Sequence, residues 1–238
     1  MIAKDIRYEV DGIALTGYLA DDETRGALRP GILVCHQGSG LTGHAKERAR
    51  MLAGLGYVAF ALDMYGEIAT SIDQAQALLR SLLADPPLLH KRALAGLDML
   101  KHTANVDTQR IAAIGYCFGG GLVLELARMG TGLASVVAFH PGLTNLPERD
   151  DRPIGGKVMV CAGADDPLIP AAAREKFIEL MNACGADWQL LVYSHAAHSF
   201  TDKSIDALGL RGFAYHEPTD RRSWSAMREL LSETLGPV

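Results

Sequence analysis

One cysteine in the sequence stands in a setting that suits a nucleophile. Cys117 follows the apolar run 111–114, a predicted strand, and precedes residues 119–124, which are predicted to open a helix. A side chain on so sharp a turn is pushed out above the sheet, and the flanking glycines leave room for the close helix–strand contact. The helix N-terminus also favours negative charge on the sulfur. The pattern is typical of a nucleophile elbow, with cysteine replacing serine, although a buried thiol in an ordinary turn has the same appearance.

A nucleophile on such an elbow needs an acid after a later strand and then a histidine, in that order along the chain. Asp165 and Asp166 follow the predicted strand 157–163, and His195 and His198 follow the next strand. Taken singly, an aspartate before a proline commonly starts a turn, and a loop histidine is commonly solvated. The order of all three groups therefore carries the hypothesis, and it leaves two acids and two histidines open.

The roles of these groups follow from their chemistry. The histidine takes the thiol proton and later activates water, while the aspartate fixes the imidazole tautomer and stabilises its positive form. The oxyanion formed on attack needs backbone N–H donors. We expect one from Phe118, the residue after the nucleophile, and one from Gly38, in the glycine-containing loop after the predicted strand 31–36.

The elements that must position these groups alternate along the chain. Apolar runs that predict buried parallel strands span residues 31–36, 57–63, 110–115, 134–140, 157–163 and 188–194. Apolar stripes at helical spacing fall within residues 45–55, 93–100, 173–181 and 219–231. Residues 6–10 and 13–18, joined by Asp11 and Gly12, predict an antiparallel hairpin. We therefore expect an α/β fold with a mostly parallel mixed sheet and helices on both faces.

Composition narrows the function classes. The chain has 238 residues, of which 48% are hydrophobic, and we expect a single domain over residues 1–238. The net charge of −5 and the lack of a basic run argue against nucleic-acid binding. Residues 1–10 lack the apolar core of a signal peptide, and no apolar stretch is long enough to span a membrane, so we expect a cytoplasmic protein. The segment 144–156 is predicted to be a long loop within the domain.

The remaining cysteines do not indicate a metal or redox site. Four cysteines occur without C-x-x-C spacing. Cys35 and Cys161 lie inside predicted strands, which makes them candidate buried structural thiols. We expect no cofactor and no metal ion.

Four segments together resemble the dienelactone hydrolase family (carboxymethylenebutenolidases): HQGSGL at 36–41, LDMYG at 62–66, GYCFGG at 115–120 and HSF at 198–200. The resemblance spans nearly the whole chain and implies an α/β-hydrolase fold without a cofactor. The pattern D-P-x-x-P at 166–170 selects Asp166 over Asp165, and the Ser-Phe pair selects His198 over His195. The implied triad is Cys117, Asp166 and His198. The implied reaction is hydrolysis of an enol-lactone or related ester through a thioester intermediate.

Two positions depart from the family's pattern. Gln37 stands where the family typically has a glutamate that pairs with the resting cysteine; an amide cannot accept a proton in that way but can form hydrogen bonds. Asp202 stands where archetypal members have an arginine that binds the substrate carboxylate, and a carboxylate there would repel an anionic substrate.

Three further residues are candidates for the substrate pocket, Tyr65, His140 and Phe200, each with packing or a structural hydrogen bond as the alternative. The predicted partner is a small ester or lactone, and the predicted assembly is a monomer or homodimer. Gln37 motivates an alternative function, a binding or sensor protein with weak catalysis. A serine hydrolase using Ser39 or Ser199 is poorly supported, because neither serine lies in a G-x-S-x-G segment.

Overall fold

The computed structural model describes residues 1–22, 27–143 and 152–238. These residues form two compact units, Met1–Ala113 with Pro237–Val238, and Ile114–Gly236. Strand β5 (Val106–Tyr116) runs from the first unit into the second. The single domain expected over residues 1–238 stays a prediction.

The first unit begins with the predicted antiparallel hairpin. Strands β1 (Ile2–Val10) and β2 (Ile13–Asp21) pair along their whole lengths around Asp11 and Gly12, which have φ of 52° and 77°. Positive φ at both central residues is the condition for a type I′ turn, whose twist matches that of the strands. The hairpin is confirmed, and both strands are longer than the sequence suggested.

The other strands of this unit form its parallel part. Strand β3 (Arg29–Cys35) pairs in parallel with β4 (Val58–Ala61), and β4 also pairs antiparallel with β2. The order β1-β2-β4-β3-β5 results. Every residue of β3 and β4 is buried, as a strand covered on both faces requires.

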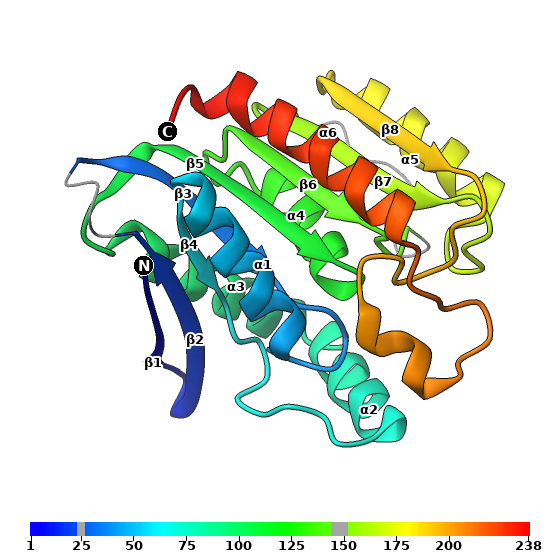
Figure 1. Cartoon of the computed structure of the whole chain (residues 1–238), viewed down its shortest axis with the longest axis horizontal. Helices are drawn as coiled ribbons and strands as arrows, with labels where there is room; N and C mark the ends of the chain where they lie inside the picture. Colours follow the sequence, from blue (N-terminus) through cyan, green and yellow to red (C-terminus); the bar gives the residue numbers. More distant parts are fainter. Residues whose placement is uncertain (23–26, 144–151) are drawn as a thin grey trace. The chain divides into compact units, whose positions relative to one another are not determined.

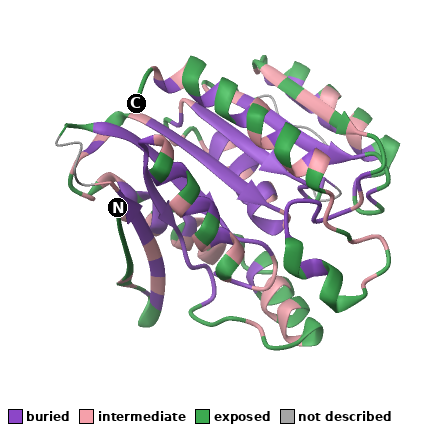
Figure 2. Cartoon of the chain, viewed as in Figure 1, coloured by how far each residue is buried: buried purple, intermediate pink, exposed green. Residues whose placement is uncertain are grey.

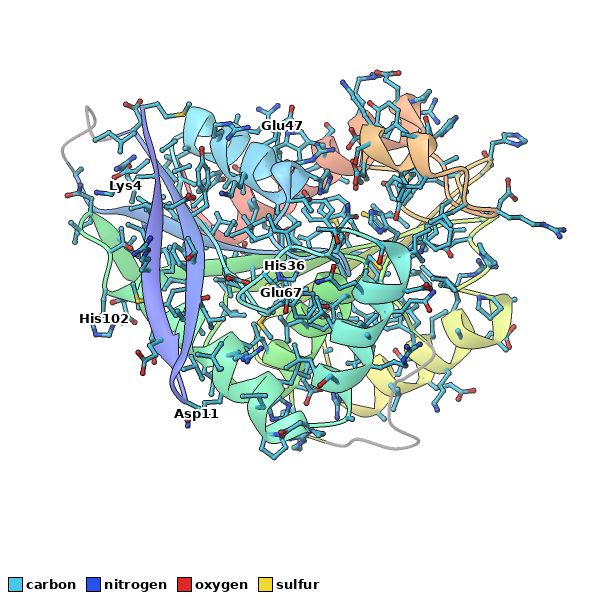
Figure 3. The ribbon with its side chains drawn as sticks, turned by 90° about the horizontal axis from the view of Figure 1, so that it is seen from below. Lys4, Asp11, His36, Glu47, Glu67 and His102 are labelled. Carbon is cyan, nitrogen blue, oxygen red and sulfur yellow. The ribbon has the colours of Figure 1, made fainter. Side chains whose placement is uncertain are left out.

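Two helices cover opposite faces of these strands (Figures 1 and 3). Helix α1 (Gly43–Leu55) packs on β2, β3 and β4, and helix α3 (Pro86–Lys101) packs on the other side. Both are predicted by apolar stripes. Helix α2 (Ile72–Leu83) is not predicted, and Leu82 is its one buried residue. Its start is stabilised by Ser71, whose hydroxyl accepts a hydrogen bond from the Gln74 N–H.

The second unit is built from parallel strands. The end of β5 is followed by β6 (Ser135–Phe139), β7 (Lys157–Gly163) and β8 (Trp188–Tyr193), in the order β5-β6-β7-β8. Figure 2 shows β6 and β7 buried along almost their whole length, whereas β8 also carries exposed residues. The strands predicted in this part of the sequence are all confirmed, with shifts of a residue or a few at their ends.

Helices cover both faces here too. Helix α4 (Phe118–Arg128) packs on one face of β6 and helix α6 (Glu217–Leu235) on the other (Figure 1). Helix α5 (Ala171–Ala183) connects β7 to β8, and the short 3₁₀ helix η2 (Lys203–Leu208) follows β8. Cys35 and Cys161 have no exposed surface, as predicted.

Most of the segment predicted as a long loop, residues 144–151, lies outside the described residues. No helix in the described part of the chain has both the length and the apolar character needed to cross a bilayer.

A close contact between α3 and the strand layer yields a stability prediction. A Cβ on Gly96 would lie 2.7 Å from Leu62 Cβ, so Gly96→Ala should destabilise the protein by about 1–3 kcal/mol, the usual cost of overpacking. Gly54 in α1 is the matched control, because a Cβ there meets nothing within 4 Å. Gly54→Ala should stabilise by about 0.4–1 kcal/mol. Urea unfolding measures both; equal effects of the two substitutions would contradict the packing described.

Candidate active site

Cys117 occupies the sharp turn that the sequence predicts. It is the residue before α4, with φ of 53° and ψ of −112°, and its N–H donates to Phe139 O at 3.0 Å. A Cβ on Gly115 would overlap the carbonyl of Gly119, so this turn requires a glycine at position 115. Positive φ at a non-glycine residue is strained, by roughly 1–3 kcal/mol, and such strain concentrates at functional sites. The Cys117 side chain is half-buried, unlike the buried thiols of the other cysteines.

Asp166 and His198 form a buried pair. His198 Nδ1 donates to Asp166 Oδ2 at 2.7 Å, and neither side chain has exposed surface. The other carboxylate oxygen, Oδ1, accepts from the Leu168 N–H at 2.8 Å. Both oxygens are therefore engaged, which fixes the carboxylate plane and the imidazole tautomer that leaves Nε2 available as a base.

Asp165 and His195, the alternatives to Asp166 and His198 in the sequence, are in a different environment. Asp165 and His195 are both exposed, whereas Asp166 is 3% exposed and His198 is fully buried. The structure therefore brings together the acid and the histidine that the sequence pattern selected.

The electrostatics of His198 connect it to Cys117. Burial lowers the pKa of His198, but the negative charge of the Cys117 thiolate, the hydrogen bonds that the imidazole donates to Asp166 and Cys117, and the charge of Asp166 outweigh this effect and raise the pKa to about 10. The Nε2 atom of His198 is itself buried. The negative charge of the Cys117 thiolate is the largest of the effects that raise the pKa of His198.

Aromatic rings surround the His198 imidazole. His140 and Phe213 both meet it edge-on, with ring centroids 5.1 Å and 4.8 Å away. His140 is fully buried with φ of 39°, and its Nε2 bonds the Thr201 hydroxyl at 2.8 Å. Phe200, also fully buried, packs edge-on against His140 at 5.1 Å. Of the predicted pocket residues, His140 therefore contacts His198 directly and Phe200 packs against His140. Their roles toward a substrate stay predictions. Phe213 has no pattern in the sequence that would have identified it.

Asp202 has a local role that the sequence comparison does not suggest. It is 5% exposed and caps η2, because its Oδ1 accepts from the Ser204 N–H at 2.9 Å and from the Ser204 hydroxyl at 2.7 Å. These bonds hold the carboxylate against its own helix.

The remaining predicted residues belong to the first unit. His36 is buried there at the end of β3, at the level of the strands between α1 and α3 in Figure 3. Its Nδ1 donates to Gln37 O at 2.6 Å, its Nε2 accepts from the Met64 N–H at 3.2 Å, and burial lowers its pKa, so the ring is neutral. Its ring centroid lies 5.1 Å from that of Tyr65, and this packing anchors the loop that carries Gln37.

The Gln37 side chain is buried, and Gly38 offers open space, since a Cβ there would meet only Leu79, at 4.0 Å. The roles of Gln37, Gly38 and Tyr65 toward Cys117 stay predictions.

The side chains of this site are those of nucleophilic and acid–base chemistry. Within the described ranges, no group of three or more His, Cys, Asp or Glu side chains is arranged to hold a metal ion.

Comparisons with known proteins agree with this fold. The dienelactone hydrolase-like promiscuous phosphotriesterase P91, from metagenomic libraries, is 38% identical over 99% of both chains, with a TM-score of 0.94. A Yersinia pestis protein named "Putative carboxymethylenebutenolidase" is 25% identical over 93% of this chain and 85% of its own length. The α/β hydrolase MGS-M1, from a deep-sea metagenome, shares the fold at 19% identity over 98% of both chains, with a TM-score of 0.69. The model of the dienelactone hydrolase family matches residues 15–235. With this match, the chain belongs to the dienelactone hydrolase family of α/β hydrolases, enzymes that act on esters or lactones.

Proposed function

We propose that this enzyme hydrolyses small carboxylic esters or lactones with Cys117 as nucleophile, His198 as acid and base, and Asp166 as the group that orients His198. The observation that carries the proposal is the fully buried 2.7 Å hydrogen bond from His198 to Asp166, in the same unit as the half-buried Cys117 on its strained turn. A hydrogen bond at Nδ1 fixes the orientation of the imidazole ring, and therefore the direction in which Nε2 points.

Acylation begins from the thiolate of Cys117 and the protonated imidazole of His198. The sulfur attacks the carbonyl carbon of the substrate, and the carbonyl π electrons move to the oxygen. When this tetrahedral intermediate collapses, the C–O bond to the leaving group breaks and His198 Nε2 gives its proton to the departing alkoxide. The products are a thioester on Cys117 and an alcohol, which in a lactone stays attached to the acyl chain.

Deacylation uses the change in charge that acylation causes. The Cys117 charge and hydrogen bond both raise the pKa of His198, and both disappear when the sulfur becomes a thioester. The pKa of the imidazole therefore falls, and His198 can take a proton from a water that attacks the thioester. Breakage of the C–S bond releases the carboxylic acid and restores the thiolate and imidazolium.

Backbone donors stabilise the oxyanion in both steps. Phe118 is the first residue of α4, and N–H groups in the first turn of a helix lie at its positive end, directly beside Cys117. Gly38 is the proposed second donor, on the basis of the sequence pattern of its loop. One donor of this kind contributes on the order of 10²–10³ in kcat.

Removal of the nucleophile gives the first test. Cys117→Ala should lower turnover of short acyl p-nitrophenyl esters and of dienelactones by about 10⁴–10⁶-fold, the range found on loss of a triad member. The matched control is Cys184→Ala in the same unit, which removes a thiol outside the proposed site and should retain wild-type turnover. A phosphotriester belongs in the panel because of the activity named for P91. Equal rates for wild type and Cys117→Ala on every substrate would overturn the proposal.

The pH dependence tests the role of Asp166. Acylation needs the imidazolium, so kcat/KM should fall as pH rises through the pKa of His198, about 10. The Asp166 carboxylate raises that pKa, so Asp166→Asn should move the alkaline limb to lower pH as well as lower kcat. The limb reports the coupled Cys–His pair. An alkaline limb that stays in place in Asp166→Asn would contradict this assignment.

Gln37 separates the proposed enzyme from a binding or sensor protein with decayed catalysis. An adapted site should gain little from Gln37→Glu, and we expect kcat/KM to change by less than about tenfold, because the triad already supplies the base. A much larger gain would indicate that the thiol had lost its activating group and would favour the binding function. Steady-state kinetics on the same ester panel make the comparison, with Gln37→Met as the control for loss of hydrogen bonding at similar size.

A further inference from the structure

We propose that residues 211–216, here called the strap, position the acid and the base of the triad together, with Gly212 and Phe213 as the positioning residues. The strap lies within the segment that joins η2 to α6, in the orange part of the chain in Figure 1. The inference deepens the proposed function, since the roles of Asp166 and His198 rest on it.

The strap holds the backbone of the histidine loop. His198 donates its N–H to Gly212 O at 2.9 Å and accepts from the Ala214 N–H at 3.1 Å, which forms an isolated parallel bridge. Two residues on, Phe200 O accepts from the His216 N–H at 3.1 Å. His198 lies in a loop outside any strand, so these three bonds supply the register that a strand would otherwise give it.

The same segment contacts the acid loop. Gly212 has φ of 83°, and a Cβ on it would lie 2.7 Å from Pro167 Cγ and 3.1 Å from Pro167 Cδ. Pro167 is the neighbour of Asp166 in the chain. Because Gly212 lacks a side chain, one short segment reaches both the loop of the acid and the loop of the base.

Phe213 extends the strap onto the imidazole itself. The Phe213 ring meets the His198 ring edge-on, with centroids 4.8 Å apart. The His140 ring also meets the His198 ring edge-on, at 5.1 Å. Edge-to-face contacts of this kind contribute about 0.5–1.5 kcal/mol each. Together with the Nδ1 bond to Asp166, they restrict rotation of the ring about its side-chain bonds, and so the direction of Nε2.

Hydrogen bonds also hold the strap to η2 and to the residues that follow η2. The Tyr215 N–H donates to Asp206 Oδ1 in η2 at 2.9 Å, and the Phe213 N–H donates to Leu210 O at 3.1 Å. A displacement of the strap would therefore pass to both catalytic loops. A shift of about 1 Å in a catalytic group can cost on the order of 10² in rate.

Two substitutions test the strap. Gly212→Ala should push it away from Pro167 and lower kcat by about tenfold or more with little change in KM. Gly209→Ala is the matched control: Gly209 also has positive φ, 59°, but a Cβ there meets nothing within 4 Å. Gly209→Ala also places a side chain at positive φ, but it creates no clash, so this variant should keep the wild-type kcat.

Phe213→Leu should lower kcat and shift the pKa that NMR titration measures for His198. Phe213→Tyr keeps the ring, so both kcat and this pKa should stay at their wild-type values. NMR titration of ¹³Cε1-labelled histidine measures the imidazole without any substrate. The groups that face this ring are Cys117, Asp166 and His140.

The outcomes separate the two proposals. A shifted His198 titration in Phe213→Leu, restored in Phe213→Tyr, supports the strap even if no ester in the panel is turned over, in which case only the proposed function fails. An unchanged titration in Phe213→Leu, or equal losses of kcat in Gly212→Ala and Gly209→Ala, overturns the strap. If Gly212→Ala does not fold, the Phe213 pair decides.

Discussion

The buried hydrogen bond between Asp166 and His198 is the interaction on which the site depends. A carboxylate with no exposed surface is costly unless it is paired and hydrogen-bonded, and loss of one partner of a buried pair typically costs about 3–5 kcal/mol. Here both Asp166 oxygens have donors, and the imidazole completes the pair. The parallel pairing of β7 with β8 places the loops that follow these strands at the same edge of the sheet, which brings the two residues together. The orientation of the His198 imidazole follows from this contact, which also contributes, after the charge of Cys117, to its raised pKa.

The unit that contains Asp166 and His198 also has several residues with strained backbone conformations. Within the described part of the second unit, the non-glycine residues with positive φ are Cys117, His140, His195 and Ser199. The first three lie one or two residues after the end of a strand, and Ser199 follows His198 directly. Such conformations persist only where the surroundings over-determine them. The buried strands β6 and β7 and the close contacts of Gly115 and Gly120 provide that support. The sheet therefore supports strained backbone conformations in the segments that follow β5, β6 and β8, which include Cys117, the residue proposed as the nucleophile.

Local patterns in the sequence predict a large part of this arrangement. The elbow at Cys117 follows from glycine spacing, and the chain order of Asp166 and His198 follows from the connectivity of parallel strands. The choice against Asp165 and His195 needed the family pattern, because neighbouring residues in a loop differ in burial only through long-range packing. The strap has no such pattern, since its bonds join residues 211–216 to a loop more than ten residues away. Helix α2 was missed although Ile72, Ala75, Leu79 and Leu82 recur at helical spacing, so the sequence did contain a signal for it.

Intact-protein mass spectrometry after acid quenching tests the central claim most directly, because it observes the bond that the mechanism requires. During turnover of p-nitrophenyl acetate, the wild-type chain should gain the mass of one acetyl group, localised to Cys117 by peptide mapping. His198→Gln should slow both the formation and the loss of this adduct, since the imidazole serves both steps. Hydrolysis that proceeds with no acyl group on Cys117 at any time point, or with the acyl group on another residue, would contradict the assignment of Cys117 as the nucleophile.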